Sequence, residues 1–390
     1  MASGKEKRAG IGRNVFFMGL ASFFNDIGSE MILPLLPLFL TNVLGAGQAV
    51  VGLIEGIADS TSSILKLFSG WLSDRFDSRK PLILAGYTIS GLTKPLLYLA
   101  NSWPFVLVIR FADRVGKGIR TSPRDALIAA SSDKTTQGKS FGFHRMMDTS
   151  GAVVGVVIAF ILLYFLSMSF HMIFLLTVIP GVLSIATIAL FVKEKKIKSP
   201  GCTPTRFSIK PFSGRFKRFV AVSVLFSLGN FSYAFLLLRT QDIGMTIALI
   251  PLMYLFYNIL YAVVAVPVGN LSDRIGKTRI LSIGFLLFSL VSLGFGFTDS
   301  LWVVLILFAL YGVFQAVYEV SSRAFIPELV EARHRGTAYG VYHTSVGLAA
   351  FPASFIMGSL WQFVSVEIAF GFGAVLSLIS AVLLLTWVRE

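Results

Sequence analysis

The chain has 390 residues, of which 55% are hydrophobic and only 14% are charged, and its mean hydropathy is +0.77. Soluble domains carry about 25% charged residues, so a water-soluble globule is excluded. The single cysteine, Cys202, cannot form an internal disulfide, and no Cys/His spacing suggests a zinc or iron–sulfur centre. We therefore expect an integral membrane protein without a metal site or cofactor.

Apolar stretches long enough to cross a bilayer recur along the whole chain. About 20 apolar residues cross the roughly 30 Å of hydrocarbon as a helix. Five stretches contain no charged side chain, at residues 172–192, 219–238, 243–272, 280–297 and 368–388. Seven others of similar length carry a few charges, near residues 14–42, 47–70, 81–101, 103–122, 137–166, 301–325 and 336–362. Together they predict an all-α membrane protein with twelve transmembrane helices.

The basic residues predict the orientation of this bundle. Lys and Arg collect on the cytoplasmic side of short loops, and here they collect in every second connection, with nine of the 34 between residues 193 and 218. We predict a multi-pass protein of the cell membrane with both termini in the cytoplasm. The net charge of +14 then reflects topology and not nucleic-acid binding.

The most basic connection divides the chain into two predicted domains. Residues 1–192 and 219–390 are each expected to form a six-helix bundle, and residues 193–218 a cytoplasmic linker. This linker is either solvated or in contact with lipid headgroups.

The two predicted bundles repeat one another in sequence. The loop sequence GWLSDRFDSRK begins at Gly70, and GNLSDRIGKTR begins at Gly269, an offset of 199 residues. A second pair, GKSFG at residues 138–142 and GTAYG at residues 336–340, has an offset of 198. Two motifs at nearly one offset indicate the duplication of a six-helix unit.

The duplicated loop resembles the signature Gly-x-x-x-Asp-Arg-x-Gly-Arg-Arg/Lys of the major facilitator superfamily, and the likeness covers the whole chain. The first copy has Asp77 and Ser78 where the family has Gly and Arg. The resemblance implies two pseudo-symmetric bundles that transport a solute by alternating access, with the loop as a conformational latch. The latch positions are Gly70, Asp74, Arg75, Gly269, Asp273 and Arg274. The alternative is that these charges only fix the topology.

Ionisable residues lie inside the predicted spans of the first half. Asp26 and Glu30 are four positions apart, as are Glu55 and Asp59, so each pair shares one helix face. A charge at mid-bilayer costs on the order of 3 kcal/mol, so such groups pair or line a wet cavity. Neighbouring buried carboxylates do not all ionise easily. We predict that these four carry protons, Asp26 and Glu30 first; structural ion pairs are the alternative.

Other charged and polar residues in the spans form the expected substrate site, namely Arg110, Asp113, Arg114, Arg145, Asp148, Tyr257 and Asn258. Arg110 matches the fourth-span arginine of the superfamily's drug/proton antiporters, whose motif Arg-x-x-Gln-Gly-x-Gly reads RFADRVGKG here. The additional charges favour a polar or anionic solute over a greasy cationic drug.

Two further spacings predict contacts. Glu319 and Arg323 are four apart and are expected to pair on one helix face. Separately, tyrosine and asparagine at three- or four-residue spacing in the predicted span at residues 243–272 form a polar stripe that offers an opposite wall for the substrate cavity. Gly151 and Gly155 form a small-residue pair that predicts close helix packing.

These features predict a proton-coupled secondary transporter of a small polar or charged solute, working by alternating access and more naturally as an exporter. We expect a monomer that is not an enzyme, with a small-molecule substrate, protons and the lipid bilayer as its partners. No Walker-type sequence supports ATP-driven pumping.

Two alternatives stay open. One is an importer or exporter of a metal ion, metal chelate or siderophore, in which the four acidic residues supply hard oxygen ligands. The other is a polytopic membrane enzyme or receptor, a class that does not require the loop motif twice.

Overall fold

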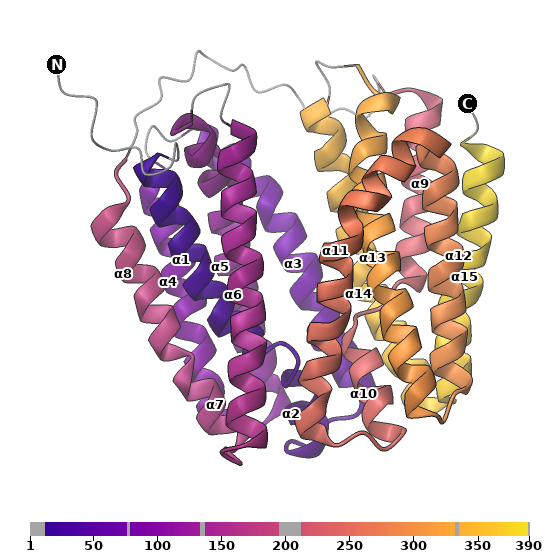
Figure 1. Ribbon diagram of the computed structural model, residues 1–390, viewed down its shortest axis with the longest axis horizontal. Coiled ribbons are helices and arrows are strands. Elements are labelled where there is room, and N and C mark those ends of the chain that lie inside the picture. The colour runs from indigo at the N-terminus through magenta and orange to yellow at the C-terminus, as the bar shows by residue number, and fades with distance from the viewer. Residues whose placement is uncertain (1–11, 76–78, 133–136, 195–211, 332–334, 389–390) are drawn as a thin grey trace. The chain divides into compact units, whose positions relative to one another are not determined.

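The computed structural model describes residues 12–75, 79–132, 137–194, 212–331 and 335–388, and their regular secondary structure is entirely helical. The first half contains α1 (Arg13–Glu30), α2 (Leu36–Asn42), α3 (Gln48–Arg75), α4 (Lys80–Thr93), the 3-10 helix η1 (Lys94–Leu99), α5 (Trp103–Ala130), α6 (Gln137–Tyr164), α7 (Phe170–Leu176) and α8 (Val178–Phe191) (Figure 1). The second half contains α9 (Gly214–Gly229), α10 (Ala234–Asp242), the 3-10 helix η2 (Ile247–Leu249), α11 (Ile250–Ile275), α12 (Lys277–Phe297), α13 (Leu301–Leu329), α14 (Arg335–Phe363) and α15 (Val366–Trp387).

Many of these helices are long and apolar enough to cross a membrane. Within the described residues, nine segments meet this condition, namely Lys80–Leu99, Lys139–Tyr164, Phe170–Phe191, Gly214–Asp242, Ile247–Ile275, Lys277–Phe297, Leu301–Leu329, Thr337–Phe363 and Val366–Trp387. Helices α3 and α5 are 28 residues long but carry ionisable residues along their length. The chain is therefore a multi-pass membrane protein, and the count of twelve spans stays a prediction.

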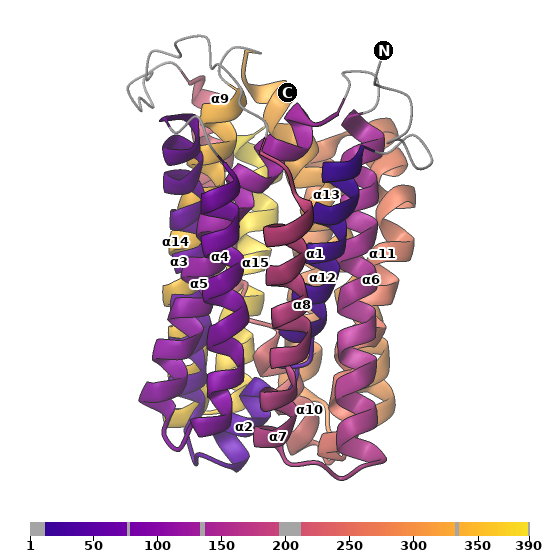
Figure 2. The same cartoon turned by 90° about the vertical axis from the view of Figure 1, so that its left-hand side faces the viewer.

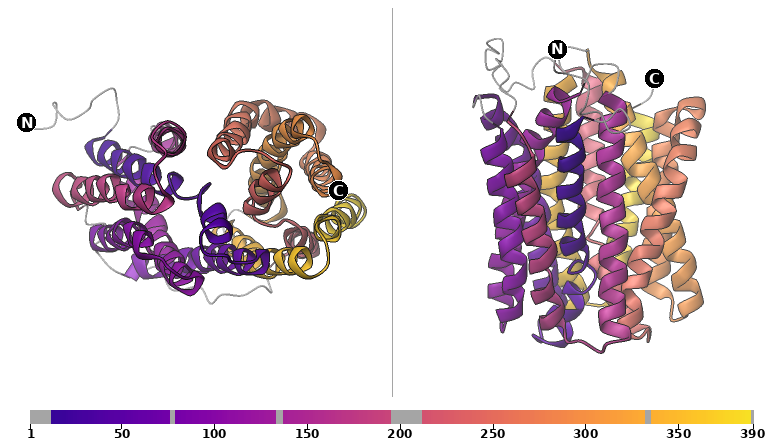
Figure 3. Two further views of the ribbon diagram at one scale, coloured as in Figure 1. Left: turned by 90° about the horizontal axis from the view of Figure 1, so that it is seen from below. Right: turned by 60° about the vertical axis from the view of Figure 1, so that its left-hand side comes forward.

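The helices pack into two compact units. Unit 1 comprises Met1–Phe39 and Thr61–Thr205, and unit 2 comprises Leu40–Ser60 and Arg206–Glu390. The chain passes from unit 2 to unit 1 within α3. Within each unit the helices run side by side, as the end-on and side views show (Figure 3). Most of the predicted linker at residues 193–218 lies outside the described residues, and the predicted domain limits stay predictions.

In unit 1, α1 packs against α6 and α8, and α4 packs against α5 and α8 (Figure 2). The contact between α1 and α6 is close because of two glycines. A Cβ on Gly151 would lie 2.4 Å from the carbonyl oxygen of Phe23, and a Cβ on Gly155 would lie 2.5 Å from that of Ile27. This confirms the predicted close-packing pair. The apolar core of this unit contains Val15, Met18, Ala21, Ile83, Tyr87, Leu127, Ile128, Ile188 and Val192.

In unit 2, α12 packs against α13 and α15, and α9 packs against α14 and α15. Aromatic rings fill its centre, where Phe226 stacks on Phe285 with ring centroids 3.8 Å apart. The first half of α3 belongs to this unit. A Cβ on Gly52 would lie 2.1 Å from the carbonyl oxygen of Ser354 in α14, and Ser60 donates to the carbonyl of Gly347 at 2.6 Å.

Candidate functional site

Helix α5 carries a buried charged cluster. Its members are Arg110, Asp113 and Arg114. They are three and one positions apart in sequence, so they lie on adjoining faces of the helix. Their side chains are at most 8% exposed, and each arginine lies 3.7 Å from Asp113 Oδ2, through Nη1 of Arg110 and Nε of Arg114. Ser90 of α4 also donates to Asp113. The structure thus brings three predicted substrate residues together, and they neutralise part of one another's charge.

A buried lysine links this region to α1. Lys94, the first residue of η1, is 4% exposed. Its Nζ donates to Asn25 at two oxygens, the backbone O at 3.2 Å and Oδ1 at 3.0 Å. Asn25 Nδ2 in turn donates to Asp26 Oδ1 at 3.0 Å. The Asn25 amide therefore connects the Lys94 ammonium to the Asp26 carboxylate.

Sequence reasoning did not place Lys94 or Asn25 in the site. The available signal was a lysine inside an apolar segment, since Lys94 lies in the interior of the candidate span Lys80–Leu99. Such a charge requires a buried partner.

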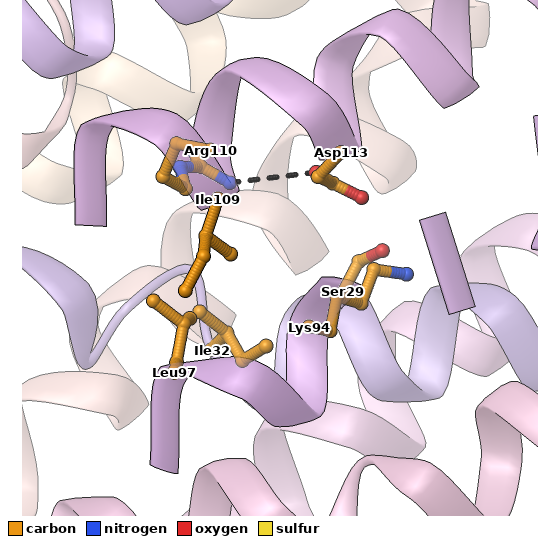
Figure 4. Close-up of a pocket in the computed structure, with 7 residues that line it drawn as sticks. All are labelled: Ser29, Ile32, Lys94, Leu97, Ile109, Arg110 and Asp113. Carbon is orange, nitrogen blue, oxygen red and sulfur yellow. Dashed lines mark ion pairs between the residues drawn. The ribbon is translucent and has the colours of Figure 1, made fainter. Parts of the chain in front are cut away.

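A small pocket joins the lysine to the α5 cluster (Figure 4). Its volume is about 10 Å³, room for about one water molecule. The lining residues are Ser29, Ile32, Lys94, Leu97, Ile109, Arg110 and Asp113. Figure 4 shows the Arg110–Asp113 ion pair above the pocket, with Ser29 and Lys94 on its other side. Polar groups of α1, η1 and α5 thus converge on one site.

The four predicted proton carriers lie in both units. Asp26 and Glu30 are half-buried in α1 of unit 1, whereas Glu55 is buried and Asp59 is exposed on the part of α3 that belongs to unit 2. Several charges act on Asp26: Asp148 of α6 repels its carboxylate, and Lys117, Arg120 and Lys94 attract it.

Helix α6 contributes the remaining predicted charges of unit 1. Asp148 is half-buried, and its Oδ2 lies 3.5 Å from Nδ1 of the buried His144. Arg145, which follows His144 directly in α6, is exposed. His144 was not predicted as a site residue, although its spacing of four from Asp148 is a signal for this contact.

Unit 2 contains a larger polar cavity of about 220 Å³. Its walls come from α3, α9, the connection between α9 and α10, α13 and α14. They comprise Asp59, Ser227, Asn230, Phe231, Ser232, Tyr233, Tyr311, Gln315, Tyr318, Glu319, Val346, Ala350 and Ser354. Arg323 pairs with Glu319 one turn away, which confirms the predicted i,i+4 pair.

The predicted residues of α11 do not line this cavity. Tyr257 is buried and its ring packs edge-on against those of Tyr254 and Tyr311. Asn258 donates to the backbone carbonyl of Tyr254 at 2.8 Å. Tyr257 thus packs behind the lining residue Tyr311, and both residues stay predictions as substrate ligands.

The two copies of the predicted latch differ in what can be described. Gly70, Asp74 and Arg75 fall at the end of α3, where their side chains lie outside the described residues. In the second copy, Asp273 Oδ1 lies 3.2 Å from Nζ of Lys277, and Lys277 also binds Glu328 of α13. Arg274 is exposed, and a Cβ on Gly269 would make an ordinary contact with Val320.

Among the residues that the structure describes, no three His, Cys, Asp or Glu side chains lie close enough together to hold a metal ion.

Comparisons with known proteins agree with this architecture. The sequence profile of the Major Facilitator Superfamily matches residues 18–240 and 219–390. An "Uncharacterized MFS-type transporter" of Methanocaldococcus jannaschii is 40% identical over 381 residues, covering 96% of this chain and 95% of the relative. The "Multidrug resistance protein MdtH" of Proteus mirabilis is 24% identical over 356 residues, covering 89% and 86%.

Solved structures show the same fold. The nucleoside transporter NupG superposes with a TM-score of 0.80 at 13% identity, covering 96% of this chain and 99% of NupG. The human organic anion transporter MFSD10 superposes with a TM-score of 0.66 at 18% identity, covering 95% and 99%. With a family match over both halves and a relative at 40% identity, the chain belongs to the major facilitator superfamily and is a secondary transporter, not an enzyme.

Proposed function

We propose that this transporter moves a small polar or charged solute out of the cell in exchange for protons, by alternating access. The observation that carries the proposal is the polar chain from Asp26 through Asn25 to the buried Lys94. A carboxylate within an apolar bundle is costly unless it has a function or a partner. Here the partner is an amide that also holds a buried cation on another helix.

Through these hydrogen bonds, protonation of Asp26 can affect how the helices pack. When Asp26 is ionised, its charge offsets that of Lys94, Lys117 and Arg120, and its oxygen accepts from Asn25. Protonation removes the negative charge and leaves the nearby cations less well balanced. Because Asn25 lies on α1 and Lys94 on η1, the change alters the free energy of the contact between these elements. A ligand or proton shifts a conformational equilibrium by such differential stabilisation.

The proposed direction of transport is supported by similarity to named relatives, and the proposed kind of solute by the residues that line the unit 2 cavity. MdtH, a relative at 24% identity, is named for multidrug resistance, which supports export. The carriers of the same fold include proteins named for nucleosides and organic anions, and the polar lining of the unit 2 cavity is compatible with a polar or charged cargo.

The proposal is tested by solute accumulation in cells that express wild type, Asp26→Asn or Glu30→Gln. A broad panel of metabolites and toxic compounds is offered with and without a protonophore. We expect wild type to lower the accumulation of a subset of compounds, the protonophore to remove this effect, and Asp26→Asn to abolish it because the neutral amide cannot exchange a proton. Asp299→Asn, a carboxylate whose side chain is 89% exposed, serves as the control and should export normally. Gradient-driven export that persists with unchanged pH dependence in Asp26→Asn would refute the assignment.

A further inference from the structure

The cavity in unit 2 lies where a membrane helix is interrupted. Helix α9 ends at Gly229 and α10 begins at Ala234, within the 29-residue candidate span Gly214–Asp242. Asn230 leaves the helical region with φ −89° and ψ 84°, and the backbone N–H of Ser232 donates to Ser354 Oγ at 3.3 Å. Irregular backbone at membrane depth is tolerated where it is buried in protein or lines a cavity. The interruption therefore opens polar groups to the cavity in the middle of the span.

The lining of the cavity has an acidic and aromatic character. Asp59 and Glu319 contribute carboxylates, and no lysine or arginine is found among the described residues that line it. The cation closest in sequence to Glu319 is Arg323, whose side chain is 62% exposed, and exposed ion pairs are weak. The C-terminal end of α9, which carries partial negative charge, also reaches this wall at Asn230.

Aromatic and amide groups complete the walls. The rings of Tyr311 and Tyr318 are both more than nine-tenths buried, and Gln315 donates to the hydroxyl of Tyr311 at 2.9 Å. Tyrosine faces attract cations through the ring quadrupole and pack well against apolar groups. The amide oxygens and hydroxyls add hydrogen-bond acceptors.

We propose that this cavity binds the protonated amine of an organic solute, with Glu319 and Asp59 as its anionic partners and the tyrosine rings against its carbon skeleton. The volume of about 220 Å³ is many times the roughly 10–15 Å³ that a single water molecule needs, which suits an organic group better than a bare ion. The inference deepens the proposed transport function by naming the chemical class of the cargo, an organic amine, and it departs from the expectation that the charges of the first half favour a polar or anionic solute.

The test measures equilibrium binding to the purified full-length protein in lipid nanodiscs, without any gradient. Three probes share a phenyl ring and differ in charge: phenethylamine, 2-phenylethanol and 3-phenylpropionate. We expect wild type to bind the amine roughly tenfold or more tightly than the alcohol, because hydrogen bonds to charged groups are the stronger ones. The acid should bind most weakly.

Variants assign the effect to the cavity. Glu319→Gln and, independently, Asp59→Asn should each weaken phenethylamine binding by roughly tenfold while leaving 2-phenylethanol binding unchanged. Glu319→Asp, which keeps the charge, should recover part of the loss. Glu367→Gln removes an exposed carboxylate from α15, outside the cavity, and should bind all three probes like wild type.

The inference is wrong if wild type binds phenethylamine no more tightly than 2-phenylethanol, or if both carboxylate variants, folded with wild-type thermal midpoints, retain full amine affinity. Because no gradient is present, these results are independent of proton coupling. A failure of the Asp26→Asn transport test leaves amine selectivity intact, and a failure here leaves proton-driven export intact.

Discussion

At the scale of single residues, the buried ammonium of Lys94 links η1 to α1 in unit 1. It provides two hydrogen bonds to Asn25, and its removal leaves the Asn25 oxygens without a charged donor. We expect Lys94→Met to lower the free energy of unfolding by about 2 kcal/mol or more, because hydrogen bonds to charged groups contribute about that much. Thermal unfolding in detergent measures the effect, with Lys217→Met, an exposed lysine of α9, as the control. Equal midpoints for the two variants would contradict the role of Lys94.

The residues of this cluster also show how far sequence reasoning reaches. Arg110, Asp113 and Arg114 were expected in one site, and the structure brings them together, because proximity on one helix follows from spacing alone. The Lys94–Asn25 contact joins residues 69 positions apart. Its existence depends on how two helices pack, which no local pattern specifies. The sequence therefore predicts that Lys94 needs a buried partner, but it does not predict that this partner is Asn25.

At the scale of the helices, the α1–α6 contact depends on the absence of side chains at two positions. A methyl group on Gly151 would lie 2.4 Å from a backbone oxygen of Phe23, whereas Gly142 on the same helix has no neighbour within 4 Å of that position. We expect Gly151→Ala to destabilise the protein by about 1–3 kcal/mol through overpacking. Gly142→Ala should leave stability unchanged or raise it by up to about 1 kcal/mol, since alanine is the better helix former. Thermal unfolding of both variants in one detergent makes the comparison, and similar midpoints would show that α1 and α6 adjust without cost.

Helix positions were largely predictable, whereas helix interruptions were not. The charge-free stretch at residues 219–238 predicts one continuous span, but the structure breaks it between α9 and α10. A hydropathy profile estimates how favourably a segment transfers from water into lipid, and it does not detect a local change of backbone direction. The break contains no proline, and its stabilising contact is with Ser354 of α14, far away in sequence. The unit 2 cavity was therefore beyond the reach of the sequence pattern, although its two acidic residues, Asp59 and Glu319, had been singled out.

At the scale of the whole molecule, the duplicated motifs predict a chain built from two six-helix halves, and the family match to both halves agrees with this. The packing adds a feature that a linear repeat does not encode. Residues 40–60 precede most of the first half in sequence but belong to the compact unit formed by the second. Gly52 and Gly56 allow this, because a Cβ on either would come within 3 Å of α14 backbone atoms.

This arrangement predicts that the second half does not reach full stability alone. A fragment of residues 206–390 lacks the segment 40–60, and with it the hydrogen bonds from Ser60 to Gly347 and from Ala49 to Gln362. We expect this fragment, expressed alone, to be more sensitive to protease than when it is co-expressed with residues 1–205. Gly52→Leu in the 1–205 fragment should abolish the rescue by a clash with Ser354, whereas Gly142→Leu, in open space, should not. Equal protease resistance of residues 206–390 with and without the partner fragment would show that unit 2 is complete without residues 40–60.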